Sequence, residues 1–260
     1  MAAIQRDILI CGVQFDAELK SGSMSVLELA LIAVKYGVQG VEYREVYWKE
    51  KAKELPALRE QLDRMGLKRT YATFTTLFNS DPEKQKQLLQ DLDDAHALGA
   101  PIMRVFRGDP PGDGPEDLPI LDATRALIDR AAGYGMQLAL ENHIGSLGSH
   151  MNDVKGAIER LNSPAIGANI DTSNYVLNHQ NPVDAVHLLA PWIIYTHLKD
   201  ARETAEGLKA TYLGNGIIPI GEIVAALDAT GRSFPLTFEF GGEGDPEGAI
   251  AKSLAYLQAL

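Results

Sequence analysis

The sequence predicts an α/β protein that folds as a single (β/α)8 TIM barrel over residues 1–260. Two observations lead to this fold class. Short apolar runs alternate eight times with longer amphipathic stretches, which is the pattern of repeated βα units and a parallel sheet. The length of 260 residues is also close to the size of about 250 that is usual for such a barrel. We therefore expect one domain with no internal boundary.

The first half of the chain contains four of the expected strands and the clearest helix signals. One helix is expected from Ser25, a typical N-cap residue, to Gly37, a typical C-terminal stop. Asp81 followed by Pro82 favours the start of another helix, which Gly99 closes. The strands are expected at 8–14, 40–45, 67–73 and 101–106, with a further helix over 51–65.

A segment rich in Pro and Gly, residues 107–119, lies between the two halves of the chain. Because the helical pattern resumes directly after it, we expect a long loop at the top of the barrel and not a linker between domains. The remaining strands are expected at 136–142, 165–171, 192–198 and 235–240. A helical segment follows each of them, and the seventh connection is longer than the others.

Charge and composition favour a small-molecule ligand. The chain has 24 Lys and Arg against 35 Asp and Glu, and its net charge of −11 repels nucleic acid. No signal-peptide pattern opens the sequence, and no run approaches the about 20 apolar residues of a membrane span. The single cysteine, Cys11, lies in the first expected strand and is expected to be buried. We therefore expect a cytoplasmic protein without a nucleic-acid or membrane partner.

Four side chains of metal-binding type stand at the ends of late apolar runs. They are Glu141 in LALEN, Asp171 in IGANID, His197 in IIYTHLKD and Glu239 in LTFEF. Because the strand ends of a parallel barrel meet on one face, we expect these groups to lie together. Three carboxylates and one imidazole suit a divalent cation, with Mn²⁺ as the first expectation and Mg²⁺, Co²⁺, Zn²⁺ or Fe²⁺ as alternatives. Taken singly, each acid could equally cap a helix or form an ion pair.

These motifs resemble the xylose-isomerase-like superfamily of sugar isomerases and epimerases. The resemblance rests on LALENH, GANIDTSN, THLKD and TFEF in this order, with GVEYRE on the second expected strand, and it covers nearly the whole chain. It implies that the four side chains bind a divalent metal ion, as they do in ketose 3-epimerases, hydroxypyruvate isomerases and inosose dehydratases. It also implies a sugar or keto-polyol substrate and a homodimer or homotetramer, which are common in the superfamily.

The metal chemistry indicates which residues react. A bound divalent ion polarises a substrate carbonyl and acidifies the neighbouring C–H group. Glu141 and Glu239 are the candidate catalytic pair, because one carboxylate can remove this proton to give an enediolate and the other can return it on the opposite face. The same intermediate supports isomerisation. Loss of a β-hydroxyl would instead make a dehydratase of a keto-cyclitol, keto-sugar or dehydroshikimate-type substrate. A non-catalytic sugar-binding barrel is the remaining alternative.

Five further residues are candidates for substrate binding, namely His143, Asn174, Lys199, Glu42 and Arg107. His143 lies in the ENH segment, where members of the superfamily contact substrate hydroxyls, and loop packing is its alternative role. Asn174 departs from several 3-epimerases and from endonuclease IV relatives, which have a histidine there, and this weakens the match to either. Lys199 could steady the enediolate oxygen, Glu42 could orient the substrate or a neighbouring group, and Arg107 could bind a carboxylate or hydroxyl. For these three residues a structural ion pair or loop contact is the alternative.

Overall fold

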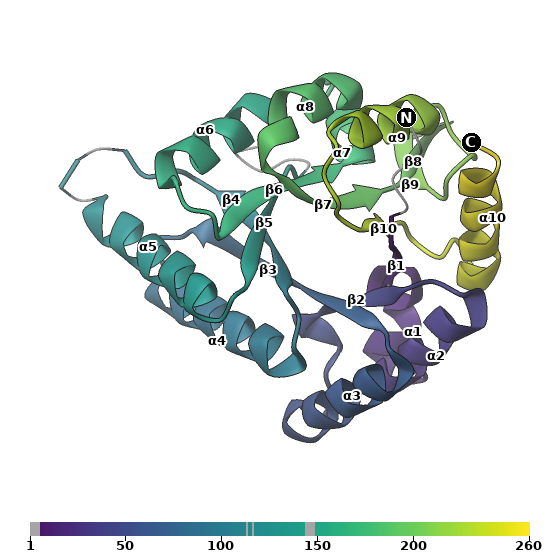
Figure 1. Cartoon of the computed structure of the whole chain (residues 1–260), viewed down its shortest axis with the longest axis horizontal. Coiled ribbons are helices and arrows are strands. Elements are labelled where there is room, and N and C mark those ends of the chain that lie inside the picture. The colour runs from purple at the N-terminus through teal and green to yellow at the C-terminus, as the bar shows by residue number, and fades with distance from the viewer. Residues whose placement is uncertain (1–5, 113, 116, 144–148) are drawn as a thin grey trace.

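The computed structural model describes residues 6–112, 114–115, 117–143 and 149–260. Eight parallel strands close into a barrel, and helices form a ring around it (Figure 1). The order around the barrel is β1-β10-β7-β6-β5-β4-β3-β2, which follows the sequence because β8 and β9 form a separate two-stranded sheet. The predicted fold class is therefore confirmed.

The barrel strands lie close to their expected positions. They are β1 (Ile8–Cys11), β2 (Gly40–Arg44), β3 (Lys68–Phe78), β4 (Ile102–Gly108), β5 (Gln137–Glu141), β6 (Ile166–Asp171), β7 (Ile193–Leu198) and β10 (Leu236–Phe238). The first strand is shorter than predicted, because the 3-10 helix η1 (Gly12–Phe15) begins directly after Cys11. β3 is longer than predicted and pairs with β4 through a register shift between Ala72 and Thr76.

The helices begin and end at residues that satisfy their terminal backbone groups. Ser25 accepts a hydrogen bond from the backbone N–H of Glu28, whose carboxylate accepts one from the N–H of Ser25, and Gly37 closes this helix in the left-handed conformation. The predicted caps at Ser25 and Asp81 are confirmed. Within the described residues, none of the helices is both long and apolar enough to span a membrane. The helices are α1 (Asp16–Ser21), α2 (Val26–Tyr36), η2 (Glu45–Tyr47), α3 (Lys51–Met65), α4 (Pro82–Leu98), α5 (Leu118–Gly133), α6 (Met151–Leu161), α7 (Thr172–Leu177), α8 (Pro182–Leu189), η3 (Ala190–Trp192), α9 (Ile220–Ala229) and α10 (Pro246–Gln258).

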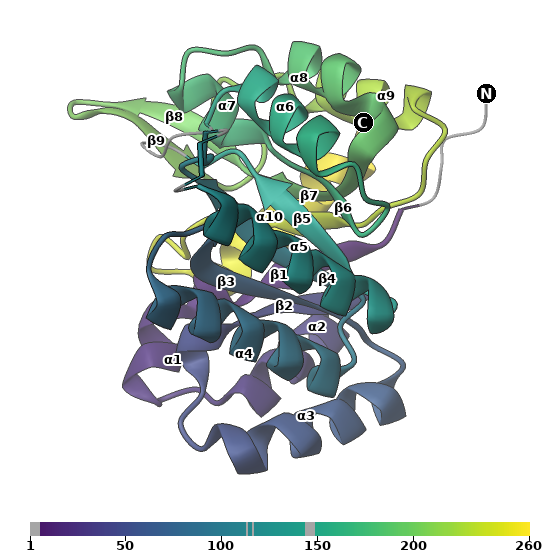
Figure 2. The ribbon, with the colours of Figure 1, turned by 90° about the vertical axis from the view of Figure 1, so that its left-hand side faces the viewer.

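An antiparallel hairpin occupies the long seventh connection. β8 (Asp200–Thr204) pairs with β9 (Gly207–Thr211), and the hairpin projects from the barrel at the left of Figure 2. The carboxylate of Asp200 is buried and accepts hydrogen bonds from four backbone N–H groups, those of Ala201, Gly214, Gly216 and Ile218. This residue therefore ties the return of the hairpin to the end of β7.

Side chains alternate between the two faces of each barrel strand. On β2, Val41 and Tyr43 join the apolar layer beneath the helices. Glu42 and Arg44 alternate with these residues along the strand, and they contact charged groups inside the barrel. A smaller apolar cluster fills the other end of the interior and consists of Leu9, Ala139, Ile194 and Tyr195. The barrel interior is thus apolar at the amino-terminal end of the strands and charged at their carboxyl-terminal end.

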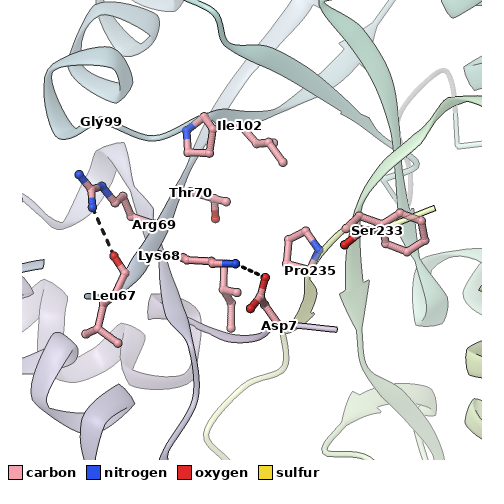
Figure 3. Close-up of a pocket in the computed structure, with 12 residues that line it drawn as sticks. Asp7, Leu67, Lys68, Arg69, Thr70, Gly99, Ile102, Ser233 and Pro235 are labelled. Carbon is pink, nitrogen blue, oxygen red and sulfur yellow. Dashed lines mark hydrogen bonds and ion pairs between the residues drawn. The ribbon is translucent and has the colours of Figure 1, made fainter. Parts of the chain in front are cut away.

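A hollow of about 420 Å³ opens at the amino-terminal end of the strands (Figure 3). Its charged groups are already engaged, because Lys68 pairs with Asp7, and Arg69 donates to the carbonyl oxygen of Leu67. Barrel enzymes carry their active sites at the opposite end, where the strands finish. We therefore assign this end of the barrel a structural role.

Two glycines test how tightly the barrel is packed. A Cβ atom at Gly167 in β6 would lie 2.5 Å from the carbonyl oxygen of Trp192 and 2.8 Å from a methyl carbon of Ile194. We expect Gly167→Ala to lower the free energy of unfolding by about 1–3 kcal/mol, because the core must move to accept it. Gly156→Ala in α6 is the matched control: a Cβ there meets nothing within 4 Å, and alanine favours a helix by about 1 kcal/mol. Urea denaturation compares the variants, and a Gly167→Ala protein as stable as wild type would contradict this packing.

Candidate metal centre

Four side chains meet at the carboxyl-terminal ends of four neighbouring strands, β5, β6, β7 and β10. They are the four groups that the sequence singled out for metal binding, Glu141, Asp171, His197 and Glu239. Each offers one ligand atom, and these atoms all lie within 4.8 Å of one another. All four residues are buried. The arrangement has the size and the donor atoms of a site for one metal ion.

The imidazole of His197 presents its two nitrogens to different partners. Nε2 lies 2.7 Å from Oε2 of Glu42. Nδ1 lies 3.4 Å from Oε2 of Glu141 and 3.7 Å from Oε2 of Glu239. The side-chain amide of Asn169 also approaches Nδ1, at 3.0 Å. Nδ1 is therefore the nitrogen that faces the cluster of carboxylates.

Two cations hold Glu239 and Asp171. The Nζ atom of Lys199 lies 2.7 Å from Oδ2 of Asp171 and 2.5 Å from Oε2 of Glu239. Arg44 donates from Nη2 to the other oxygen of Glu239, Oε1. Lys199, a predicted substrate-binding residue, thus touches two of the four candidate ligands.

Arg104 is a site residue that the sequence analysis did not single out. It is buried on β4, and its Nε atom lies 2.9 Å from Oε2 of Glu141. Its guanidinium group stacks over the ring of Phe106, 4.3 Å from the ring centroid. A signal for it was present in the sequence PIMRVF. An arginine between two apolar residues that face the helices must point into the barrel, where its charge needs a partner.

Four carboxylates, those of Glu42, Glu141, Asp171 and Glu239, stand against three permanently charged cations and His197; the three cations are Arg44, Arg104 and Lys199. Burial raises the pKa of Asp171 to about 7, with further raising by Glu239 and Glu141 against the lowering by Lys199. Burial lowers the pKa of His197, but the carboxylates of Glu42, Glu239 and Glu141 outweigh it and raise this pKa to about 10. At neutral pH the side chains alone therefore hold protons that a divalent cation would displace.

The donor atoms fit a divalent cation. Besides their ion pairs with Arg104 and Lys199, the buried oxygens Oε2 of Glu141 and Oδ2 of Asp171 have no hydrogen-bond donor of good geometry among the described residues. Buried acceptors of this kind are costly unless a donor or a metal ion satisfies them. A cation would satisfy both oxygens and replace the protons that His197 and Asp171 hold without it. Manganese or magnesium suits a set of three carboxylates and one imidazole.

Asn174 and His143 are two further predicted substrate-binding residues. The side-chain amide of Asn174 donates to Oε1 of Glu141 at 3.2 Å, and its backbone N–H donates to Oδ1 of Asp171 at 2.9 Å. His143 packs against Phe106 with 4.4 Å between the ring centroids, and burial lowers its pKa. Asn174 therefore contacts two of the candidate ligands.

Glu42 and Arg107 occupy different surroundings. Glu42 is fully buried on β2 and contacts His197 itself. Arg107 lies near the end of β4, where burial lowers its pKa and the charges of Asp153 and Asp109 counter this effect. Among the interactions of the described residues, none joins Arg107 to a candidate ligand. The structure thus brings Glu42 into the cluster and leaves Arg107 outside it.

The chain is similar to several characterised proteins. A stretch of 195 residues is 24% identical to an inosose dehydratase of Clostridium beijerinckii and covers 68% of this chain and 63% of that relative. The structure of a probable 3-DHS dehydratase of Bacillus anthracis superposes with a TM-score of 0.78 at 17% identity, over 97% of this chain and 98% of the other. A D-allulose 3-epimerase of Methylomonas sp. superposes with a TM-score of 0.75 at 17% identity, over 100% and 99%. At these identities the structural likeness shows the shared fold.

The comparison with protein families covers most of the chain. The family described as xylose isomerase-like TIM barrel matches residues 30–260. This range contains seven of the eight barrel strands and all four candidate metal ligands. The resemblance drawn from the strand-end motifs is therefore confirmed, and the chain belongs to the xylose isomerase-like TIM barrel family.

Proposed function

We propose that this protein is a divalent-metal-dependent isomerase or epimerase of a sugar or a related polyhydroxy ketone. The observation that carries the proposal is the position of Glu141 and Glu239 within the cluster. Their strands, β5 and β10, are separated by β6 and β7 around the barrel, so the two carboxylates approach the candidate metal position from different sides. Solved structures similar to the chain include a D-allulose 3-epimerase and an L-ribulose 3-epimerase, which supports this reaction class.

The cation would be held by the four ligands and would supply Lewis acidity to the substrate carbonyl, with Mn²⁺ as our first choice. Neighbouring residues keep the two candidate bases, Glu141 and Glu239, ionised. Although burial raises the pKa of each carboxylate, Arg104 and His197 lower that of Glu141, and Lys199, His197 and Arg44 lower that of Glu239. Both groups are therefore ionised at neutral pH and able to accept a proton.

The site of proton return decides whether the product is an epimer or an isomer. One carboxylate removes the proton next to the carbonyl, and the ammonium group of Lys199 can donate a hydrogen bond to the substrate oxygen on which negative charge develops. Return of the proton by the other carboxylate on the opposite face inverts the carbon, whereas return at the neighbouring carbon gives an isomer. Beside the cluster, a pocket of about 640 Å³ lined by Arg44 and Phe74 has room for a sugar-sized molecule.

A dehydratase is the second candidate. The observation that favours it is the sequence match to two inosose dehydratases, at 24% and 23% identity. The same proton removal, followed by loss of a β-hydroxyl group, would give this reaction with no change in the ligands. The residues at the site fit both reactions, so the product must distinguish them.

Other expectations stay predictions. We propose a small-molecule substrate, with no nucleic-acid or membrane partner, and a cytoplasmic location. We also propose a homodimer or homotetramer. His143 and Arg107 stay proposed substrate-binding residues, together with Asn174 and Lys199.

The metal site can be tested by calorimetry. We expect metal-stripped protein to bind one Mn²⁺ ion, and His197→Ala and Asp171→Asn to abolish this binding, because each change removes a ligand. His187→Ala is the control, because this histidine is exposed on α8. Binding that survives both ligand changes would exclude these residues as the site.

Metal binding should also release protons. At pH 7 we expect about one to two protons to leave the stripped protein per Mn²⁺ bound, since ligands must lose their protons to bind metal. His197, with a pKa of about 10, supplies one proton, and Asp171, with a pKa of about 7, supplies part of another. At about pH 8.5 only His197 still carries a proton, so the release falls towards one. Titrations in buffers of different ionisation enthalpy measure it, and a release near zero at pH 7 would contradict these protonation states.

The reaction can be tested in deuterium oxide. With Mn²⁺-loaded protein and a panel of ketoses, we expect exchange of the C–H next to the carbonyl, followed by NMR. At saturating Mn²⁺, Glu141→Gln and Glu239→Gln should each slow it by about 100-fold or more, as expected for loss of a general base. Glu203→Gln, on the exposed hairpin, should not change the rate. A rise in ultraviolet absorbance from a conjugated product would identify a dehydratase, and the absence of both signals would favour a non-catalytic sugar-binding barrel.

A further inference from the structure

Glu42 is a fully buried carboxylate that contacts the candidate metal ligands without being one of them. It lies on β2, which is not a neighbour of β7, the strand that carries His197. The two residues are 155 positions apart in the sequence and meet only across the closed barrel. A buried carboxylate is costly unless partners compensate its charge, and the partners of Glu42 indicate its role.

The two oxygens of Glu42 have separate partners. Oε1 accepts a hydrogen bond from the thiol of Cys11 at 3.0 Å and lies 3.6 Å from Nε of Arg44. Oε2 lies 2.7 Å from Nε2 of His197. Cys11 and Arg44 thus hold one side of the carboxylate and aim its other oxygen at the imidazole. With both oxygens engaged and the side chain fully buried, Glu42 is poorly placed to bind a substrate.

This geometry selects one nitrogen of His197 for metal binding. A neutral imidazole carries one proton, and a carboxylate beside one nitrogen keeps the proton there and leaves the lone pair on the other nitrogen. We propose that Glu42 is a positioning residue that holds the proton of His197 on Nε2 and presents Nδ1 to the metal ion. This inference rests on the proposed metal centre and assigns Glu42 a role other than substrate binding.

Other neighbours of the ring cannot replace Glu42 once a metal ion is bound. The Nδ2 group of Asn169 lies 3.0 Å from Nδ1 and favours the same tautomer by donating to that nitrogen, but a metal ion on Nδ1 would displace this contact. Tyr195 packs edge-on against the ring with 5.3 Å between the centroids, which restricts the ring plane but does not distinguish the nitrogens. Within the described part of the chain, Glu42 is the hydrogen-bond partner of Nε2.

The first test uses the wild-type protein and Zn²⁺, a diamagnetic probe that this ligand set can also hold. Long-range proton–nitrogen NMR of the Zn²⁺-loaded protein reports which imidazole nitrogen carries the proton. We expect His197 to show a downfield, slowly exchanging proton on Nε2 and no proton on Nδ1. A proton on Nδ1, or Zn²⁺ on Nε2, would overturn the inference.

The second test changes Glu42 with a matched control. Glu42→Gln keeps the size of the side chain and removes its charge, and we expect it to weaken Zn²⁺ binding by about 10–100-fold in calorimetry, as for other partners of metal-binding histidines. The Nε2 proton signal should also move upfield and exchange faster, because a neutral amide oxygen is a weaker acceptor than a carboxylate. Glu45→Gln is the control, because Glu45 accepts a hydrogen bond from the backbone N–H of Phe74 and has no contact with His197. It should bind Zn²⁺ as tightly as wild type.

The outcomes separate this inference from the proposed function. If wild type binds Zn²⁺ and Glu42→Gln matches it in affinity and NMR signal, the positioning role is wrong while the metal centre stands. If wild type binds no Zn²⁺, both are wrong. If Glu42→Gln does not fold, the NMR signals of the wild-type protein decide the question by themselves.

Discussion

Burial of four carboxylates at one end of the barrel is the constraint on which the site depends. Such charges are costly in the interior unless cations and hydrogen bonds compensate them. Arg104 compensates Glu141, while Lys199 and Arg44 compensate Asp171 and Glu239. Without a metal ion, protons on His197 and in part on Asp171 balance the remaining negative charge, and a divalent ion could take their place. Glu239 contacts both Arg44 and Lys199, and Lys199 also contacts Asp171, so the charges of the cluster depend on one another.

Closure of the barrel creates this unit. β1 pairs with both β2 and β10, which places the last barrel strand one strand away from β2. Only then can Arg44 reach Glu239, which lies 195 positions later in the sequence. The backbone N–H of Glu239 donates to the carbonyl oxygen of Leu198, which fixes the end of β10 against β7. The same alternation that packs Val41 and Tyr43 against the helices directs Glu42 and Arg44 to the interior. The alternation of side chains along the strand thus determines both the packing of the core and the assembly of the site.

Local patterns in the sequence predicted much of this protein. The alternation of apolar runs gave the fold class, and the caps at Ser25 and Asp81 fixed two helix starts. The meeting of the four candidate ligands at the strand ends followed from the geometry of a parallel barrel. The hairpin of β8 and β9 was not predicted, because its two strands are only five residues long and mostly polar, which leaves little periodicity to read. The extension of β3 was missed because a register shift, and not a change in composition, carries it to Phe78.

The sequence by itself thus determined the barrel and the kinds of side chain at its strand ends, since both depend on local periodicity. Only the tertiary structure decided which charges meet. Arg104 joins Glu141 across neighbouring strands, and Glu42 reaches His197 across the barrel. A strand pattern shows that a charged side chain points inward, but not which partner it finds or which nitrogen of a histidine stays free. Those choices depend on how eight strands are staggered when the barrel closes, because that stagger sets the distances between groups far apart in the chain.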